Sequence, residues 1–332
     1  MGKLRFLLLA LATMAVAQPS PVKILKATPQ NIQWGHYDAD VKPVIVVKSG
    51  ETIRVETVSG TPDRLISGGA PDDDVMKELR AVRADAKDRG PGGHLLTGPI
   101  GVEGAEPGDV LQIDILEIIP RVPYGYNNFG PNSGLLLDEF PYSRAKVIKL
   151  DMATMTCEFA PGIHFPAKPF FGSMVVAPVA GRINSAPHGY YAGNMDNKEL
   201  VAGTTLYIPV ARPQALLNIG DGHLAMGDGE IDVTAVESSL TGVLRLTVRK
   251  DMHLLYPRAE TPTHIIAMGF HEDLNEAARR AGREMMDYLV TNKGLSRDDA
   301  YMLISVAIDM HVTQVVDGVK GVHMMMPKAL FK

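Results

Sequence analysis

The sequence has little cysteine, little excess charge and few long apolar runs, and each scarcity excludes something. Cys157 is the only cysteine among 332 residues, so no disulfide can form within the chain and stability has to come from packing. The formal net charge is −5, which provides no basic footprint for nucleic acid or an anionic membrane. Beyond the N-terminus, no stretch approaches 18 uninterrupted apolar residues. We therefore expect a soluble mature protein without nucleic-acid or membrane partners.

The first seventeen residues have the pattern of a secretory signal peptide. Lys3 and Arg5 precede the apolar run of residues 6–12, and residues 15–17 (AVA) offer a small-x-small cleavage site before Gln18. The run is too short to span a bilayer, and the alternatives are an N-terminal anchor or a buried strand. The prediction is a secreted or periplasmic protein, cleaved after Ala17, whose folded region comprises residues 18–332.

Glycine and proline are abundant, at 32 and 23 residues, and they favour turns and strands over helices. Strands are predicted at 43–47 and 52–57, joined by a turn at 48–51, and at 110–115 after a turn at 106–109. Repeated turn–strand units of this kind indicate a β-sandwich or barrel. We also expect a surface helix over 72–88, a long loop over 123–134 and a hairpin over 145–159.

The last eighty residues change character. Apolar residues at helical spacing predict an amphipathic helix over 273–291. Ser296 and Asp299 form a capping-box pattern that opens a second helix, ending near residue 310. The β-branched residues 313–316 predict terminal strands. The expected fold class is α+β: a mainly antiparallel β-sandwich or barrel in the β-rich part, 18–250, with helices concentrated in the C-terminal third, 251–332.

Residues 193–230 hold an unusual concentration of ionisable side chains between glycines. A packed core has no need of so many, because each buried charge must be paired or must bind something. Glycine lets backbone and side chains approach a ligand closely. This segment therefore predicts a functional site. Its ionisable residues are Asp196, Lys198, Glu199, Asp221, His223, Asp228 and Glu230.

Several long motifs of the chain resemble the acetamidase/formamidase family. They are residues 193–200 (GNMDNKEL), 203–210 (GTTLYIPV), 220–223 (GDGH) and 227–230 (GDGE), with 96–109 upstream and 298–303 downstream. The resemblance covers nearly the whole mature chain. It implies hydrolysis of a short aliphatic or small cyclic amide to ammonia and a carboxylate, by a largely β fold with a divalent metal at the site. It also implies a homo-oligomer, a dimer or larger.

The residue types agree with metal use. An amide is unreactive toward neutral water, and a bound cation can polarise its carbonyl and generate hydroxide. We expect a divalent cation, zinc with calcium as the alternative. The candidate metal ligands are imidazoles and carboxylates of the kind that zinc accepts: Asp196, His223, Glu103 and His94.

Three residues are candidates for catalysis. Glu230 is the preferred donor of a proton to the departing amine, although it could be only the first polar residue of a strand. His223 could be a ligand or a general acid/base. Lys198 could hold an anionic intermediate, but an exposed salt bridge is equally compatible with its position.

Other amidase chemistries find little support in the sequence. It has neither the Gly/Ser-rich nucleophile segment of Ser-Ser-Lys amidases nor a Gly-x-Ser-x-Gly elbow. Cys157 lies in a plain strand pattern, where a free thiol is commonly inert. The alternative to an enzyme is a catalytically inactive periplasmic protein that has the same fold and binds small molecules. The sequence leaves the particular amide open.

Overall fold

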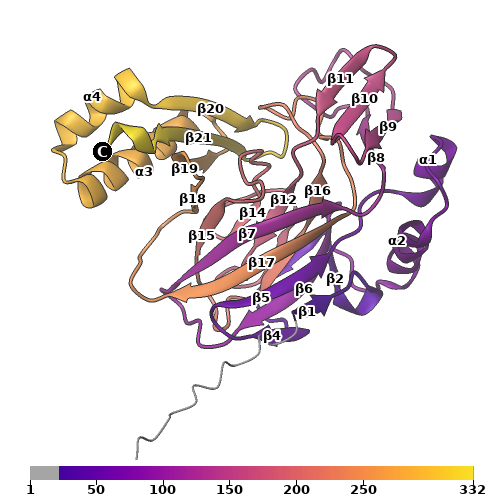
Figure 1. Cartoon of the computed structure of the whole chain (residues 1–332), viewed down its shortest axis with the longest axis horizontal. Coiled ribbons are helices and arrows are strands. Elements are labelled where there is room, and N and C mark those ends of the chain that lie inside the picture. The colour runs from indigo at the N-terminus through magenta and orange to yellow at the C-terminus, as the bar shows by residue number, and fades with distance from the viewer. Residues whose placement is uncertain (1–21, 332) are drawn as a thin grey trace, which may run out of the picture.

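The computed structural model describes residues 22–331, in which strands are more extensive than helices (Figure 1). The predicted signal peptide and its cleavage after Ala17 lie outside the described residues. None of the described helices is both long and apolar enough to cross a membrane.

Two large sheets carry the fold, and almost all of their strand pairs are antiparallel. The nine-stranded sheet has the order β1 (Lys23–Leu25), β5 (Glu51–Glu56), β17 (Leu240–Arg249), β7 (Val110–Pro120), β15 (Thr205–Pro209), β18 (Arg258–Glu260), β19 (His264–His271), β21 (Lys320–Pro327), β20 (Asp309–Gln314). The second has the order β14 (Ala192–Asn194), β12 (Phe170–Val175), β16 (Leu217–His223), β6 (Leu95–Val102), β2 (Ile32–Trp34), with β4 (Ile45–Val47) parallel to β6.

The main hydrophobic core joins these two sheets. Ile53 of β5 and Ile113 of β7 belong to the same buried cluster as Ile100 of β6 and Met174 of β12. Because the inner faces of two sheets share one core, the architecture is a β-sandwich, which confirms the predicted fold class.

A smaller sheet projects from the sandwich (Figure 1). Its order is β11 (Ile163–Pro166), β10 (Thr156–Ala160), β9 (Arg144–Asp151), β8 (Tyr124–Phe129), and a separate pair joins β13 (Arg182–Asn184) to β3 (His36–Asp38). The hairpin predicted over 145–159 is β9–β10. The loop predicted over 123–134 was wrong in its first half, because residues 124–129 form β8 and pair with β9. The buried ring of Tyr124 and the pairing outweigh the loop-like composition.

The strands predicted at 43–47 and 52–57 form, as β4 and β5, but not as a hairpin. β4 pairs with β6 in one sheet, whereas β5 pairs with β1 and β17 in the other. The turn between them therefore carries the chain from one layer of the sandwich to the other.

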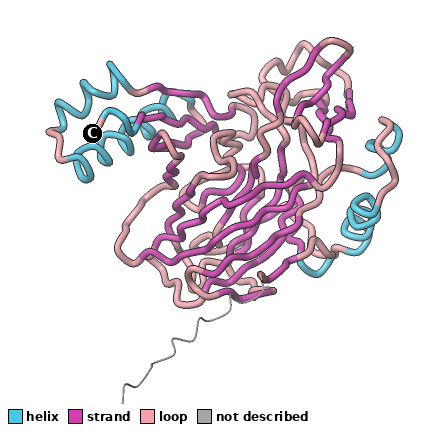
Figure 2. Tube along the Cα trace, viewed as in Figure 1, coloured by secondary structure: helices cyan, strands magenta, loops and turns pink. Residues whose placement is uncertain are grey.

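Helices occupy two places (Figure 2). α1 (Pro62–Ser67) and α2 (Asp74–Asp85) lie on one side, and α3 (Leu274–Lys293) and α4 (Arg297–Ala307) lie on the other. Two short 3-10 turns, at Pro29–Asn31 and Lys328–Leu330, complete the helices of residues 22–331. The predicted helices over 72–88, 273–291 and from 296 are present; α1 was not predicted. Ser296 caps α4 by accepting from the backbone N–H of Asp299 at 3.1 Å.

Candidate active site

Six ionisable side chains meet beside one end of the second sheet. Three overlapping groups of potential ligand atoms each lie within 4.8 Å: Asp196 with Asp221 and His223, His223 with Glu230 and Glu237, and Asp196 with Glu230 and Asp317. We call these six residues the carboxylate–imidazole cluster. Asp196, His223, Glu230 and Glu237 are buried, and Asp221 and Asp317 are partly buried.

The strands explain why residues so distant in sequence converge. β12 pairs with β14 on one side and β16 on the other, so the end of β16, with Asp221 and His223, lies near Asp196, which follows β14. The backbone of Glu237 forms a bridge with His223. The loop that carries Glu230 is tied to the end of β20, because Gly229 N–H donates to the Thr313 carbonyl at 3.0 Å.

Hydrogen bonds and ion-pair contacts hold the carboxylates in place. The Asn194 amide Nδ2 donates to Asp196 Oδ2 at 2.7 Å and to Asp317 Oδ2 at 2.9 Å, and Asn194 Oδ1 accepts from Ser173 Oγ at 2.6 Å. His223 Nε2 lies 3.3 Å from Asp221 Oδ2 and 3.2 Å from a carboxylate oxygen of Glu237. Asn194 therefore orients two of the acids, and His223 lies between two others.

Three of the acids have an unusual backbone. Asp196, Asp221 and Glu230 have φ values of 50°, 56° and 46°, in the left-handed region that side chains other than glycine rarely adopt. Such a conformation costs on the order of 1–3 kcal/mol per residue and persists where the surroundings fix it. Its recurrence at three residues of one cluster indicates a site in which side-chain positions are fixed at the cost of an unfavourable backbone conformation.

Burial and mutual repulsion shift the titration of the cluster. Burial, reinforced by the Asp221 charge, raises the pKa of Asp196 well above its ordinary value; for Glu230 burial raises the pKa too, followed by the Asp196 charge. Burial alone would lower the pKa of His223, but the carboxylates of Glu237 and Asp221 outweigh it and raise that pKa. The cluster thus holds more acidic groups than its imidazole can neutralise.

The cluster fits a divalent cation. Within residues 22–331, Asp196 Oδ1 and His223 Nδ1 are fully buried atoms without a hydrogen-bond partner. Buried polar atoms are normally satisfied, so orphaned polar atoms in an acid-rich site are suited to binding an ion or a water molecule. Carboxylate oxygen and imidazole nitrogen are the donors that zinc accepts, while the oxygen donors alone would also suit calcium.

A polar cavity of about 420 Å³ opens onto the cluster. Its lining includes Asp221, Glu230, Glu237 and Asp317 together with polar groups outside the cluster: His94, Arg83, Tyr126 and Asn128. A second pocket of about 830 Å³ has a largely apolar lining that includes Phe159, Phe165 and Phe170, and Glu230 lines both. Glu230 therefore lies between a small polar space and a larger apolar one.

The structure brings together three of the candidate ligand and catalytic residues, Asp196, His223 and Glu230, and Asp221 of the same predicted segment lies with them. His94 lines the same cavity, where its Nδ1 lies 2.9 Å from Ser185 Oγ, but it belongs to none of the ligand groups found among the described residues. Burial raises the pKa of Asp221, but the charge of His223 and then that of His94 lower it. The pKa of Asp221 therefore lies below its ordinary value.

The structure does not bring Glu103 or Lys198 to the cluster. Glu103 is exposed in the turn after β6, whereas His94 immediately precedes that strand. An eight-residue strand spans about 25 Å, so His94 and Glu103 cannot ligate one ion. Lys198 Nζ pairs with Asp228 Oδ2 at 2.8 Å and lines the apolar pocket, which corresponds to the salt-bridge alternative.

Sequence reasoning missed Glu237 and Asp317. It counted Asp221 among the ionisable residues of the predicted site segment but did not choose it as a ligand. Asp317 stands in an Asp-Gly turn and Glu237 in a mixed segment, so neither carries a local signal of function. Cys157 is buried in β10, and burial raises its pKa to about 11. Its thiol is therefore neutral at physiological pH, which agrees with an inert role.

Comparison with known proteins agrees with the motifs. The profile of the Acetamidase/Formamidase family matches residues 23–188 and 183–332. The acetamidase structure from Bacillus halodurans is 30% identical, with a TM-score of 0.79, and the match covers 93% of this chain and 98% of that one. An acetamidase/formamidase structure from Thermoanaerobacter tengcongensis is 29% identical, with a TM-score of 0.81 and coverage of 93% and 97%. A formamidase from Methylophilus methylotrophus is 25% identical over 353 residues, 84% of each chain.

These matches define the class of the protein, which is an amidohydrolase that acts on non-peptide amide bonds. More particularly, the chain belongs to the Acetamidase/Formamidase family. The family resemblance seen in the sequence motifs is thereby confirmed.

Proposed function

We propose that this enzyme hydrolyses short aliphatic amides, of the formamide and acetamide class, to ammonia and a carboxylate, with the help of a divalent cation held in the carboxylate–imidazole cluster. The observation that supports this proposal is the coincidence of the acid-rich cluster, with its orphaned Asp196 and His223 atoms, and a small polar cavity. The relatives named acetamidase and formamidase give the substrate class.

Zinc is the proposed ion, with Asp196, Asp221 and His223 as its ligands. The three share one group of potential ligand atoms within 4.8 Å. When bound, such an ion polarises an amide carbonyl and makes water a better nucleophile. Ligation requires neutral imidazole, so binding would release the proton that the surrounding carboxylates favour on His223.

Glu230 is the proposed general acid. Because its pKa is raised by burial and by Asp196, its carboxyl group can keep a proton at a pH where an exposed glutamate is ionised. In the reaction, a water molecule gives a proton to an ionised carboxylate of the cluster and its oxygen bonds to the amide carbon. The C–N bond then breaks, and the departing nitrogen takes the proton held by Glu230.

The polar cavity supports a small substrate. Its volume of about 420 Å³ lies at the low end of ligand pockets. The positive charge of Arg83 and the hydroxyl of Tyr126 line the same space, and either can stabilise the oxygen that becomes negative during attack.

We also propose that the mature enzyme is secreted or periplasmic and assembles as a homo-oligomer.

The proposal is tested by ammonia release from formamide, acetamide and small cyclic amides, with the intact protein, the chelator-treated protein and Asp196→Asn. We expect turnover only in the intact protein. The rival, an inactive binding protein, predicts measurable affinity for an amide without ammonia release from any member of the panel. Full turnover after complete metal removal would contradict the metal role alone.

A further inference from the structure

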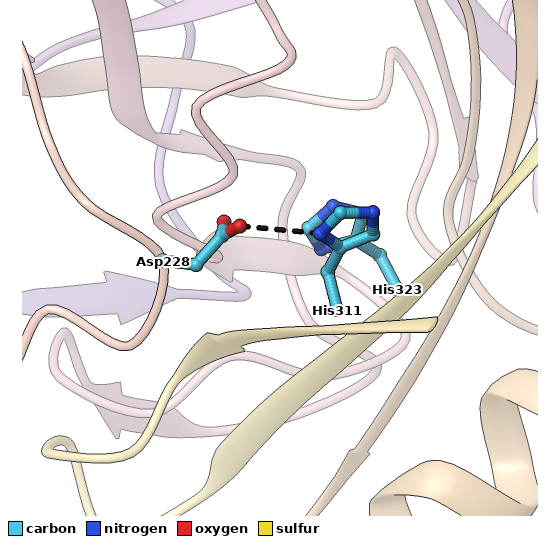
Figure 3. A group of neighbouring side chains, drawn as sticks. All are labelled: Asp228, His311 and His323. Atoms are coloured by element: carbon cyan, nitrogen blue, oxygen red, sulfur yellow. Dashed lines mark hydrogen bonds and ion pairs between the residues drawn. The ribbon is translucent and has the colours of Figure 1, made fainter. Parts of the chain in front are cut away.

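A second group of potential metal ligands lies outside the carboxylate–imidazole cluster. Asp228, His311 and His323 each offer a ligand atom within 4.8 Å of the others (Figure 3). Asp228 comes from the loop before Glu230, His311 from β20 and His323 from β21. His311 and His323 are direct partners across the antiparallel pair, so their imidazoles leave the same face of the sheet. The two rings stack, with centroids 5.0 Å apart.

His323 is held as a metal-binding histidine is held. Its side chain is fully buried, its Nδ1 lies 2.7 Å from Thr313 Oγ1, and its Nε2 has no hydrogen-bond partner among residues 22–331. A ligating histidine almost always uses one ring nitrogen for the metal and the other for an orienting hydrogen bond. Burial lowers the pKa of His323 to about 4, so the ring is neutral at physiological pH.

Asp228 also has a free ligand atom. Its Oδ2 lies 2.8 Å from Lys198 Nζ and 3.2 Å from His311 Nδ1, whereas its Oδ1 is buried without a hydrogen-bond partner in the described chain. The side chain of His311 is 36% exposed, which leaves a route from solvent to the group. Asp228 also lines the apolar pocket, so the site has both access and an open side.

We propose that Asp228, His311 and His323 bind a divalent transition-metal ion, zinc or a similar imidazole-seeking metal, at a site separate from the carboxylate–imidazole cluster. Two imidazoles and one carboxylate provide three protein ligands, and solvent from the pocket completes the coordination. The ammonium group of Lys198, 32% exposed, would move away from Asp228 toward the pocket, since two cations beside one carboxylate repel each other.

The position of this site links it to the active site. Asp228 and Glu230 flank Gly229, whose N–H donates to the Thr313 carbonyl at 3.0 Å and whose carbonyl accepts from Val315 N–H at 3.2 Å. An ion on Asp228, His311 and His323 would therefore tie the β20–β21 hairpin to the loop that positions Glu230. Its occupancy stabilises that loop rather than taking part in the reaction.

The test is metal content, which does not depend on activity. Zinc content per chain is measured by elemental analysis after each protein is saturated with zinc and excess zinc is removed. The proteins are the wild type, His311→Ala and a control, His164→Ala, which removes an exposed imidazole of β11. We expect His311→Ala to hold one zinc ion fewer per chain than the other two. When cobalt replaces zinc, the visible absorption of the cobalt ion at this site should be missing from His311→Ala.

Equal zinc content in the wild-type protein and His311→Ala would overturn the proposal. His323→Ala should also lose one ion, and circular dichroism checks its fold; if this buried variant fails to fold, the half-exposed His311 decides alone. Asp196→Asn serves as a second reference. It should retain the ion lost in His311→Ala, so failure of the proposed active-site metal and failure of this second site give different patterns of stoichiometry.

Discussion

Gly172 of β12 lies directly against the carboxylate of Asp196. A Cβ atom at position 172 would clash with Asp196 Oδ1 and with Asp221 Oδ2, and it would lie 2.9 Å from His223 Cε1. The φ angle of Gly172 is not positive, so space and not backbone conformation requires glycine here. The absence of this one side chain lets the acids and the imidazole approach one another.

Gly172→Ala should disrupt the site without unfolding the protein. The methyl group would displace Asp196 and Asp221, and a misplacement of about 1 Å can cost on the order of 100-fold in rate. We expect ammonia release to fall by about that factor and zinc affinity to fall with it. The matched control is Gly282→Ala in α3, where an added Cβ meets open space. Unchanged activity in Gly172→Ala would refute this reading of the cluster.

Glu230→Gln keeps the shape of the side chain and removes its proton. If Glu230 is the general acid, the rate should fall by roughly 10²–10⁴-fold while substrate affinity changes little. Glu103→Gln is the control, because Glu103 is exposed and remote from the cluster. Steady-state ammonia release by both variants distinguishes the two glutamates. A large loss in Glu103→Gln would restore it as a site residue and contradict the arrangement described above.

Asn194→Ala tests the orienting hydrogen bonds. Without this amide, Asp196 and Asp317 each lose a donor, and loss of such a supporting partner typically costs 10–100-fold, to order of magnitude, in metal affinity. Zinc titration against a competing chelator measures the change. Asn31→Ala removes an amide whose one donation among residues 22–331 is to the Lys26 carbonyl, so it should leave the affinity unaltered. Equal affinity in both variants would show that Asn194 does not position the ligands.

The metal-free protein should lose stability as the pH rises. Asp196, Glu230 and His223 have raised folded-state pKa values. A group whose pKa is raised on folding binds its proton more tightly in the folded state, so its contribution is present at low pH and declines as the pH rises toward the folded value. For the two carboxyls the decline begins near their unfolded pKa of about 4. Asp221, with a lowered pKa, acts oppositely in strong acid.

Burial lowers the pKa values of His188 and His323 to about 4, so these groups add stability as the pH rises, but only up to the ordinary histidine pKa of about 6.5. Thermal unfolding between about pH 6.5 and 8, with and without zinc, therefore measures the dependence that the cluster causes. We expect the melting temperature of the metal-free protein to fall across the range, and zinc to restore it most at the higher pH. If the melting temperature of the metal-free protein instead rises with pH, the folded state does not disfavour the ionised forms of these acids.

The parts of the fold that follow from local patterns could be predicted from the sequence. The amphipathic stripe of α3 and the Ser296 cap of α4 are local signals, and both helices form. Pairing is not local. The sequence around 48–51 contains nothing to say that β4 joins β6 while β5 joins β17, because the choice of partner depends on the closure of the whole sandwich.

The candidate site divides in the same way. Asp196, His223 and Glu230 stand in glycine-rich motifs and were predicted. Glu237 and Asp317 come from segments without such motifs and enter through a strand bridge and a turn after β20. Glu103 shares a motif with no cluster residue, and only the length of β6 shows that it lies too far away.

Zinc titration of the metal-free enzyme tests the central claim most directly. Metal is removed, its absence is verified by elemental analysis, and ammonia release from formamide and acetamide is followed as zinc is added back to wild-type protein and Asp196→Asn. The account predicts that wild-type activity rises from near zero with added zinc and that Asp196→Asn stays inactive throughout. Full hydrolysis by the verified metal-free wild-type protein would contradict it.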